Sequence, residues 1–535
     1  MKFNIKISAI LLASSLVLFA CTKSETKKPN ILFIVADDIG FSDIGCYGGE
    51  IKTPNIDKLA DQGLRFRTFY NMAKCNPSRS SLLTGLYQGG NGAVHLAQLT
   101  KEAGYFNIMS GKEHFDNWVP AYCKADKVFD HSFYFWATTE YFRPPSGEFE
   151  NEFYLEGQKI SADRIEYEKS PMYKTDFITD YALKWLDEAF QKDQPFFLYL
   201  PFHAAHYPLQ ARPEDIAKYR GKYMKGWDSL RVARFRRMQK LGVLSPNARL
   251  SPAEGNLNKL RGPLIPGYTN YYPWESLSVE QKDTMDLEMS VYAAMIDRMD
   301  QNIGRVLKML KENGKLENTL IIFMSDNGAC PFYATKFKDV LPGSANSYWS
   351  LRSTWANLAN TPYRQYKQSG FDGGSHTSFI ACWPGVIKPN TITDQPGHVV
   401  DIAPTFLDVL GIEYPDSIEG YPTIPLEGSS LLPVFKGKER KEPDYFISGL
   451  EEFRMFRSKD FKIDRMNGGD WELYNIKDDP TEIDNLAKKL PDKVKEMSDY
   501  YNEVYKKLNL SQQKDYPKLY PNPDMEKTRQ KQTEE

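Results

Sequence analysis

The sequence lacks an excess of charge of either sign, and it also lacks an apolar run that could cross a membrane. Of its 535 residues, 68 are Lys or Arg and 70 are Asp or Glu, which gives a formal net charge of −2. Such a balance offers no basic field to nucleic acid, so no nucleic acid partner is expected. The apolar run of residues 7–20 falls short of the roughly 20 residues of a membrane helix. The 41% hydrophobic and 13% aromatic content indicates a well-packed globular protein.

The N-terminal residues have the pattern of a targeting segment. Lys2 and Lys6 precede the apolar run, which ends in Leu18-Phe19-Ala20-Cys21 and resembles a bacterial lipobox. We therefore expect residues 1–20 to be a lipoprotein signal peptide, Cys21 to be lipidated as a membrane anchor, and residues 21–29 to be a tether. The alternative is an ordinary cleaved signal with a chance cysteine. The predicted location is that of an exported bacterial lipoprotein, in the periplasm or at the outer membrane or cell surface.

Cysteine is scarce, and its number is informative. Of the 6 cysteines, five remain when Cys21 is removed, and an odd number excludes a complete disulfide framework. At least one thiol is therefore unpaired or chemically altered. Cys75 is the natural candidate because "KCNPSRSSLLTG", residues 74–85, places it near Arg79, and a thiol beside a guanidinium is reactive. The alternative is a small buried hydrophobe at a loop-to-helix junction.

Four apolar runs stop abruptly in polar residues. They are "NILFIVADD" (30–38), "YFNIMSGKEH" (105–114), "PFFLYLPFHAAH" (195–206) and "TLIIFMSDNG" (319–328), and helical patterns such as 53–63, 175–191 and 289–314 lie between them. Continuous apolar strands that alternate with helices indicate an α/β fold with a parallel sheet covered on both faces. Ligands of such sheets bind at the carboxyl ends of the strands. The sequence therefore predicts carboxylates, a lysine and histidines on one rim.

The chain is expected to divide into a large and a small region. Residues 30–430 form the large α/β domain, with an insertion at 208–275 whose basic helix is expected to place its arginines on a solvated face. Residues 431–515 form a smaller α+β C-terminal subdomain, a short antiparallel sheet followed by the helix of residues 490–508. Residues 516–535 are expected to be a disordered tail.

Two of the strand ends supply a set of oxygen ligands. Asp37 and Asp38 end the first run, and Asp326 and Asn327 end the last. An all-oxygen site with three carboxylates suits Ca²⁺, or less readily Mg²⁺, whereas zinc prefers histidines or thiolates. Taken alone, each pair has another interpretation, a helix cap or a turn.

At this point the sequence resembles a known family, the type I formylglycine-dependent sulfatases of the alkaline-phosphatase superfamily. The resemblance runs from about residue 29 to 510, and residues 347–367 are most similar to the bacterial arylsulfatase branch. Its motifs are Cys75-x-Pro77-Ser78-Arg79 with Thr84-Gly85, Asp37-Asp38, Gly111-Lys112-x-His114, "FHAAHYPLQA" with His206, Asp326-Asn327-Gly328, and "NTPYRQYKQSGFDGGSHTSFIACWPG" with Lys367.

The resemblance implies a fold, an activity and two cofactors. The fold would be alkaline-phosphatase-like, a mostly parallel sheet flanked by helices, and the activity that of a sulfuric ester hydrolase. A maturation enzyme that reads Pro77-Ser78-Arg79 would oxidise Cys75 to Cα-formylglycine. One Ca²⁺ per chain would be held by Asp37, Asp38, Asp326, Asn327 and residue 75.

The resemblance also implies roles for the remaining residues. Residue 75, as a hydrated aldehyde, would attack sulfur and leave a covalent sulfate ester. His206, assisted by Lys367, would protonate the departing alcohol, and His114 would take a proton from the second hydroxyl to expel sulfate. Arg79, Lys112 and Lys367 would match the anionic charge, with Lys112, His206 and Lys367 contacting substrate. His203 is given a structural or substrate-rim role.

The sequence departs from the family pattern at four positions. Glu113 replaces a frequent tryptophan, Asp372 a glutamate, and His376 and Ser378 an aliphatic residue and a proline. None removes a catalytic group, but we expect them to change the pocket wall and therefore specificity.

The sequence leaves two alternative functions open. A phosphonate or phosphate ester hydrolase of the same superfamily would need further Asp/His ligands if it held two metals, and Asn327 with only 7 histidines in the chain supplies them poorly. A non-catalytic lipoprotein that binds sulfated glycans would need neither Cys75 nor His206. The expected substrate is a sulfated carbohydrate, with aryl sulfates as model substrates, and the sequence names neither the sugar nor the sulfated position.

Overall fold

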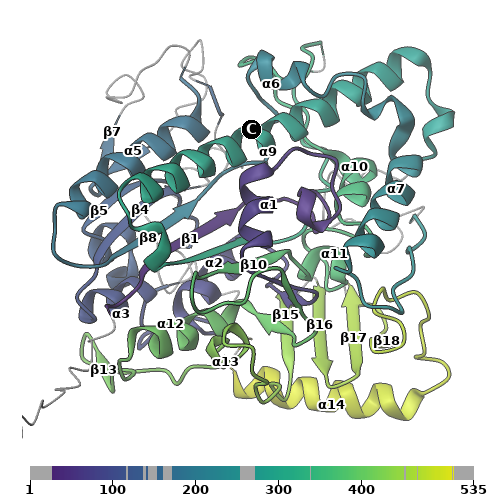
Figure 1. Cartoon of the computed structure of the whole chain (residues 1–535). Coiled ribbons are helices and arrows are strands. Elements are labelled where there is room, and N and C mark those ends of the chain that lie inside the picture. Colours follow the sequence, from purple (N-terminus) through teal and green to yellow (C-terminus); the bar gives the residue numbers. More distant parts are fainter. Residues whose placement is uncertain are drawn as a thin grey trace, which may run out of the picture.

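The computed structural model (Figure 1) describes residues 27–115, 119–136, 140–142, 153–160, 172–253, 272–337, 339–450, 453–466, 468–508 and 510. The predicted signal peptide, Cys21, most of the tether, the C-terminal tail and residues 254–271 of the predicted insertion lie outside this part. In the described chain no helix is long and apolar enough to cross a membrane.

A ten-stranded sheet forms the centre of the molecule, and its five middle strands are parallel. In spatial order they are β9 (Thr319–Ser325), β1 (Asn30–Ala36), β8 (Phe196–Pro201), β4 (Phe106–Lys112) and β5 (His131–Phe135). The first four are the four apolar runs, and they are direct neighbours. The predicted α/β fold and the common rim are therefore confirmed.

Both edges of the sheet contain antiparallel strands. Beyond β9 lie β10 (Phe379–Cys382), β2 (Leu64–Phe66) and β11 (Thr391–Thr393), and beyond β5 lie β6 (Phe153–Leu155) and β7 (Gln158–Ile160). Strand β10 runs antiparallel to β9 and β2, and β6 runs antiparallel to β5 and β7. The sheet is thus mixed. Four of these five edge strands have only three residues, which is too short for a clear apolar pattern.

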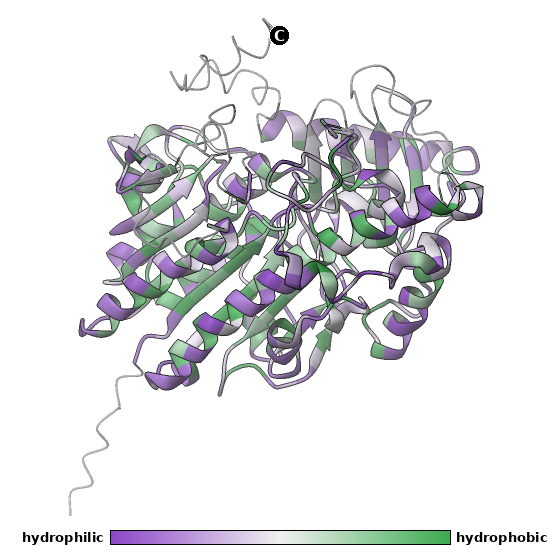
Figure 2. Ribbon diagram, turned by 90° about the horizontal axis from the view of Figure 1, so that it is seen from above, coloured by the Kyte–Doolittle hydropathy of each residue, from purple (hydrophilic) through white to green (hydrophobic). Residues whose placement is uncertain are grey.

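Each face of the sheet is buried by its own layer of helices. Leu32 and Ile34 of β1 pack in one core with α1 (Pro54–Asp61), α5 (Lys174–Phe190) and α9 (Val279–Glu312). Ile31 and Phe33 pack in a second core with α2 (Cys75–Thr84), α3 (Leu96–Glu102) and α12 (Ile402–Leu410). Burial on both sides explains the unbroken apolar runs. Figure 2 shows hydrophobic strands between helices whose outer faces are hydrophilic.

The basic helix α7 (Gly226–Leu241) differs from the prediction. Trp227, Arg231, Arg234 and Met238 recur at helical spacing and are all buried. Arg234 binds the carboxylates of Asp43 and Glu50, each at 2.7 Å. A solvated face is therefore the wrong interpretation for Arg231 and Arg234, because they lie inside the molecule and Arg234 ties α7 to the segment that follows β1.

The C-terminal region contains the short antiparallel sheet and the helix that the sequence predicts. Strands β15 (Phe446–Leu450), β16 (Phe453–Ser458), β17 (Phe461–Met466) and β18 (Glu472–Asn475) form an antiparallel sheet, and α14 (Pro491–Lys507) packs against β16 and β17. Figure 1 shows this sheet and α14 below the main sheet. Ile447 and Phe456 join the same core as α12. The boundary at residue 431 stays a prediction.

Shorter elements complete the described layers. They include α4 (Ala125–Val128), α6 (Pro213–Ala217), α10 (Arg352–Ala359), α11 (Asp372–Ser375), α13 (Leu432–Phe435), β3 (Phe69–Tyr70), β12 (Gly397–His398), β13 (Ser417–Ile418) and β14 (Tyr421–Pro422).

Candidate active site

The polar ends of the four neighbouring parallel strands meet at one edge of the sheet. Asp37 and Asp38 follow β1, His203 and His206 follow β8, Asp326 and Asn327 follow β9, and Lys112 ends β4, with His114 two residues further on. Apart from His114, which is partly buried, all have less than a tenth of their surface exposed. The carboxyl ends of parallel strands are where such sheets bind ligands.

Helix α2 presents Cys75 to this edge as its first residue. The Ser78 hydroxyl accepts a hydrogen bond from the Met72 amide at 3.0 Å and so closes the turn before the helix. Arg79 donates from Nε to Asp326 Oδ2 at 2.8 Å and from Nη1 to the Lys112 carbonyl at 3.0 Å. Arg79 therefore fixes α2 against the ends of β9 and β4, and the thiol is held at a helix N-terminus, where the backbone dipole favours negative charge.

Oxygen ligands surround Cys75. Its Sγ, one carboxylate oxygen of Asp37 and one of Asp326 all lie within 4.8 Å of one another. Asp37 Oδ1, Asp38 Oδ2 and Asn327 Oδ1 are buried without a hydrogen-bond partner. Buried acceptors without partners are costly, and carboxylate and amide oxygens are the ligands of hard divalent cations. The donor set fits one such ion.

Three buried cations balance the three carboxylates. Lys112 Nζ lies 2.6 Å from Asp37 Oδ2, Lys367 Nζ lies 2.6 Å from Asp38 Oδ1, and Arg79 binds Asp326. Burial opposes ionisation of Asp37, but Lys112 and its other cationic neighbours outweigh burial and hold the Asp37 pKa well below its usual range. Burial and the adjacent Asp37 raise the pKa of Asp326 despite Arg79. An added cation would relieve this crowding of carboxylates.

The segment that carries Lys367 is anchored on both sides of the cluster. The Lys367 amide donates to the Ala329 carbonyl at 3.2 Å, and the Gln368 amide donates to the Ala73 carbonyl at 2.7 Å. These two bonds link the loop after β9 to the residues that precede Cys75. Lys367 is therefore held in fixed register with Cys75, although it lies nearly 300 residues away in the chain.

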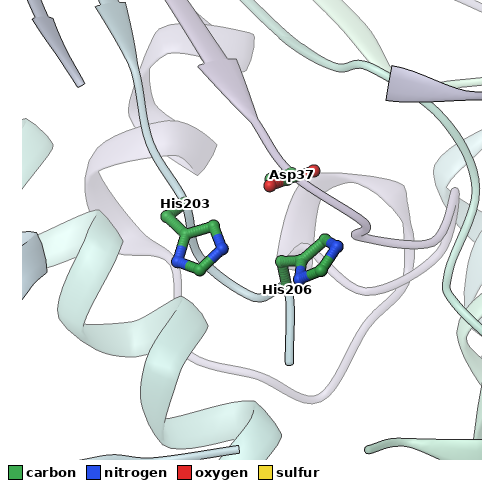
Figure 3. A group of neighbouring side chains, drawn as sticks. All are labelled: Asp37, His203 and His206. Carbon is green, nitrogen blue, oxygen red and sulfur yellow. The ribbon is translucent and has the colours of Figure 1, made fainter. Parts of the chain in front are cut away.

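The two histidines after β8 lie beside Asp37 (Figure 3). His206 Nδ1 donates to the Tyr207 carbonyl at 2.7 Å, so Nε2, 3.6 Å from Asp38 Oδ2, is the ring nitrogen that carries the lone pair. Burial lowers the pKa of His206 to about 4. The His203 ring stacks on His206 at 5.1 Å and is only 1% exposed, so His203 fits the structural role of the two predicted for it.

Two residues that sequence reasoning missed hold the histidines in place. Asn76 Nδ2 donates to His114 Nε2 at 2.8 Å, so His114 is tied to the residue next to Cys75. The Tyr141 hydroxyl donates to the carbonyls of His203 at 2.6 Å and His206 at 3.0 Å. Asn76 fills the variable position of the Cys-x-Pro-Ser-Arg motif, and Tyr141 lies some 60 residues before the loop that it binds, so neither carried a signal.

Three of the departures from the family pattern make contacts outside the Asp37 cluster. Glu113 Oε1 accepts from the Ala125 amide at 3.2 Å. Asp372 Oδ1 lies 2.5 Å from Lys462 Nζ of β17, and the His376 ring packs 4.7 Å from that of Phe41. Asp372 and His376 thereby connect the site's supporting loop to the C-terminal sheet and the aromatic core, and their effect on the pocket wall stays a prediction.

Comparison with known proteins agrees with this geometry. The family model described as sulfatase matches residues 29–412, and that described as the C-terminal part of N-sulphoglucosamine sulphohydrolase matches residues 366–514. An uncharacterized sulfatase of Schizosaccharomyces pombe is 33% identical, over 90% of this chain and 94% of its own length. An arylsulfatase of Klebsiella aerogenes is 32% identical, over 78% of this chain and 94% of its own.

A relative and a solved structure extend the comparison. An N-acetylglucosamine-6-O-sulfatase of Bacteroides thetaiotaomicron is 25% identical, over 87% of this chain and 83% of its own length. The crystal structure of Ps i-CgsB in complex with k-i-k-neocarrahexaose shares the fold, with a TM-score of 0.63 and 24% identity, over 94% of this chain and 99% of that one. The chain belongs to the sulfatase family and is a sulfuric ester hydrolase.

Proposed function

We propose that the protein removes O-sulfate from a sulfated carbohydrate, with formylglycine formed from Cys75 as the nucleophile and one Ca²⁺ as the metal. Aryl sulfates would serve as model substrates. The observation that carries the proposal is the meeting of three buried carboxylates and three buried cations around residue 75. The Ca²⁺ would be held by Asp37, Asp38, Asp326, Asn327 and residue 75, whose Sγ occupies the place of the oxygen that the matured side chain would carry.

The charges of the site suit a sulfate ester. The carboxyl groups of Asp37, Asp38 and Asp326 lie against the side chains of Lys112, Lys367 and Arg79, all of them buried. A divalent ion would leave the cluster with a positive charge of two, and an anionic ester and the sulfate dianion would both be matched there. Fixed charges in a water-poor site stabilise developing negative charge more strongly than they would in water.

Residues on the two sides of position 75 would serve different steps. In matured protein the aldehyde hydrate would supply one hydroxyl to attack sulfur and a second to remain on the residue. His114, whose Nε2 accepts a hydrogen bond from Asn76, would take a proton from that second hydroxyl. Arg79 and Lys112 hold Asp326 and Asp37 in position around it.

His206 and Lys367 would act on the departing oxygen. Both contact Asp38, at 3.6 and 2.6 Å, and thus lie together on one side of the cluster. The Tyr207 carbonyl fixes Nδ1 of His206 as a donor, so in the protonated ring Nε2 would be the nitrogen that passes a proton to the alcohol. A poorly stabilised alkoxide, such as that of a sugar, needs this proton most.

A carbohydrate is the proposed substrate class for two reasons. The relative from Bacteroides thetaiotaomicron is named for a sulfated sugar, and the C-terminal family model is named for another. The predicted signal peptide and Cys21 anchor would place the enzyme outside the cytoplasm, where sulfate esters are largely those of glycans. We further propose that the enzyme is located outside the cytoplasm, and the N-terminal signal and Cys21 are the support for this location.

Desulfation of defined sulfated mono- and oligosaccharides by matured, calcium-loaded protein tests the proposal. Release of inorganic sulfate is measured by ion chromatography, with an aryl sulfate as the positive control for an intact site. Turnover of at least one sugar sulfate supports the proposal. Robust aryl sulfate turnover with no sugar sulfate cleaved across the panel would contradict the substrate class but leave the chemistry standing.

A further inference from the structure

A cavity of about 450 Å³ lies outside the Asp37 cluster, where α5, α9 and the beginning of α6 meet. Its lining includes Tyr173 and Phe177 together with three arginines, Arg212, Arg298 and Arg305. Figure 1 shows α5 beside α9 and α6 above α9, and the residues of both pairs of helices are in contact. The volume falls within the range of about 300–1,000 Å³ that is common for small-ligand sites.

The residues that line the cavity include one more cationic than anionic side chain, and a third carboxylate, Asp215, lies just beyond the lining, 3.6 Å from Arg298 Nη1. Its three guanidinium groups face two carboxylates, Asp176 and Asp180. Asp176 accepts from Arg212 Nη2 at 2.8 Å and from Arg298 Nε at 2.7 Å, so one carboxylate holds two guanidinium groups in fixed positions. Burial opposes ionisation of Asp176, but Arg298 and its other donors lower the Asp176 pKa, and the carboxylate stays charged.

Arg305 is the most open of the three arginines. Its side chain pairs with Asp180 and is 43% exposed, compared with 23% for Arg298 and 15% for Arg212. A guanidinium group presents several N–H donors in a plane and binds carboxylate or sulfate oxygens two at a time. Arg305 can therefore keep its contact with Asp180 and still meet an anion that enters the cavity.

Stacked rings connect the cavity to the leaving-group side of the active site. Tyr173 packs on Tyr141 at 5.7 Å, Tyr141 on His203 at 5.0 Å, and His203 on His206 at 5.1 Å. The last pair is visible in Figure 3. His206 is the proposed acid for the departing alcohol, so the stack leads from the leaving-group side of the active site to the cavity. Tyr141, Tyr173 and His203 are buried, so a glycan that reaches both places must pass around these rings.

We propose that this cavity is a remote subsite for an anionic sugar unit, one that bears a sulfate or carboxylate, of the same glycan whose sulfate is cleaved. The inference rests on the proposed function and narrows the substrate class, because a ligand that fills both the active site and the cavity must be an oligosaccharide or a polymer. The arginines bind the anionic group through charge-assisted hydrogen bonds. Gln301 and Asn302, which also line the cavity, donate to Asp297 and Asp176 and so help to fix its charged groups.

The test compares Arg305→Gln with wild type on three substrates, an aryl sulfate, a sulfated monosaccharide and an anionic oligosaccharide with the same reacting sugar. KM for the oligosaccharide should rise about tenfold, the effect of one charge-assisted hydrogen bond. KM and kcat for the aryl sulfate and for the sulfated monosaccharide should not change. Asp180→Asn, which removes a negative charge from the cavity, should lower KM for the oligosaccharide only.

Arg249→Gln is the matched control. Arg249 is 47% exposed and pairs with Asp479 and Asp484, so it resembles Arg305 in exposure and pairing but is remote from the cavity. The proposal would be overturned if KM for the oligosaccharide were equal in the Arg305 and Arg249 variants. It would also be overturned if Arg305→Gln raised KM for the sulfated monosaccharide as much as KM for the oligosaccharide.

Calorimetric titration separates this proposal from the broader one. If no sugar sulfate is cleaved, the proposed function fails, and binding of the anionic oligosaccharide to wild type but ten times more weakly to Arg305→Gln would still support the subsite. Inorganic sulfate is titrated at the same ionic strength. Sulfate binding that depends on Arg305 while oligosaccharide binding does not would show a site for free anions only and overturn the proposal.

Discussion

Replacing Asp326 by asparagine tests the metal site because the change keeps the shape of the side chain and removes its charge. In the structure Asp326 Oδ2 accepts from Arg79 Nε at 2.8 Å, and Arg79 Nη2 lies 3.9 Å from Asp37. Breaking a buried ion pair costs roughly 3–5 kcal/mol. Here the cost should be smaller, since Arg79 keeps Asp37 nearby and the repulsion between Asp37 and Asp326 disappears.

The calcium response is the decisive quantity. A ligand that binds only the folded state at about 100 times its Kd stabilises it by about 2.7 kcal/mol. Wild type should therefore melt higher in saturating calcium than in chelator, and Asp326→Asn should lose most of that increment together with its sulfatase activity. Differential scanning fluorimetry with and without calcium measures both melting temperatures.

Asp43→Asn provides the matched control. Asp43 is also fully buried and is bound by an arginine, Arg234, at 2.7 Å, but it lies outside the Asp37 cluster. This variant should lose stability in chelator and keep the full calcium increment. A calcium increment in Asp326→Asn equal to that of wild type would refute the ligand assignment, as would stoichiometric zinc without calcium in elemental analysis of the wild type.

Three other outcomes are expected. His206→Ala should lower kcat/KM for a sugar sulfate by about 10²–10⁴-fold, the usual contribution of a general acid, and for an activated aryl sulfate by much less. The pKa values of His95 and His398 are lowered by burial to about 3, below the unfolded value of about 6.5, so each histidine's contribution is complete above pH 6.5. As the pH falls from 6.5 towards 3, stability should decline by about 1.4 kcal/mol per pH unit for each histidine, measured by urea unfolding at pH 7 and pH 5. Cys21→Ser should move the protein from the membrane fraction to the soluble fraction with its specific activity unchanged.

Each of these expectations has a result that contradicts it. Equal losses on both substrate classes would show that His206 is not the acid. A His398→Gln variant that loses as much stability on acidification as wild type would rule out the linkage for that residue. A Cys21→Ser protein that stays with the membranes would argue against the lipid anchor.

The central strands and most of the site could be predicted because one physical cause determines both. A strand buried on both faces must be apolar throughout, and a ligand at its carboxyl end requires polar residues immediately afterwards. The change from Ala36 to Asp37, or from Ser325 to Asp326, marks that point in the sequence. The pattern does not give the order of the strands, which depends on how the intervening helices cross over.

Other contacts had no sequence signal because they join distant segments through ordinary residues. Asn76 and Tyr141 act through single hydrogen bonds to groups whose position only the fold determines. Arg231 and Arg234 were misplaced because a charged residue on a helix is usually solvated. Arg234 is buried because Asp43 and Glu50 meet it inside the molecule.

The dependence of turnover on maturation of Cys75 tests the central claim most directly. Protein made with and without a formylglycine-generating enzyme is assayed on an aryl sulfate, and mass spectrometry of the peptide that contains residue 75 gives the converted fraction. The account predicts that both forms fold and that turnover rises in proportion to the converted fraction from almost zero. Sustained turnover by protein in which residue 75 is wholly unconverted cysteine would contradict it.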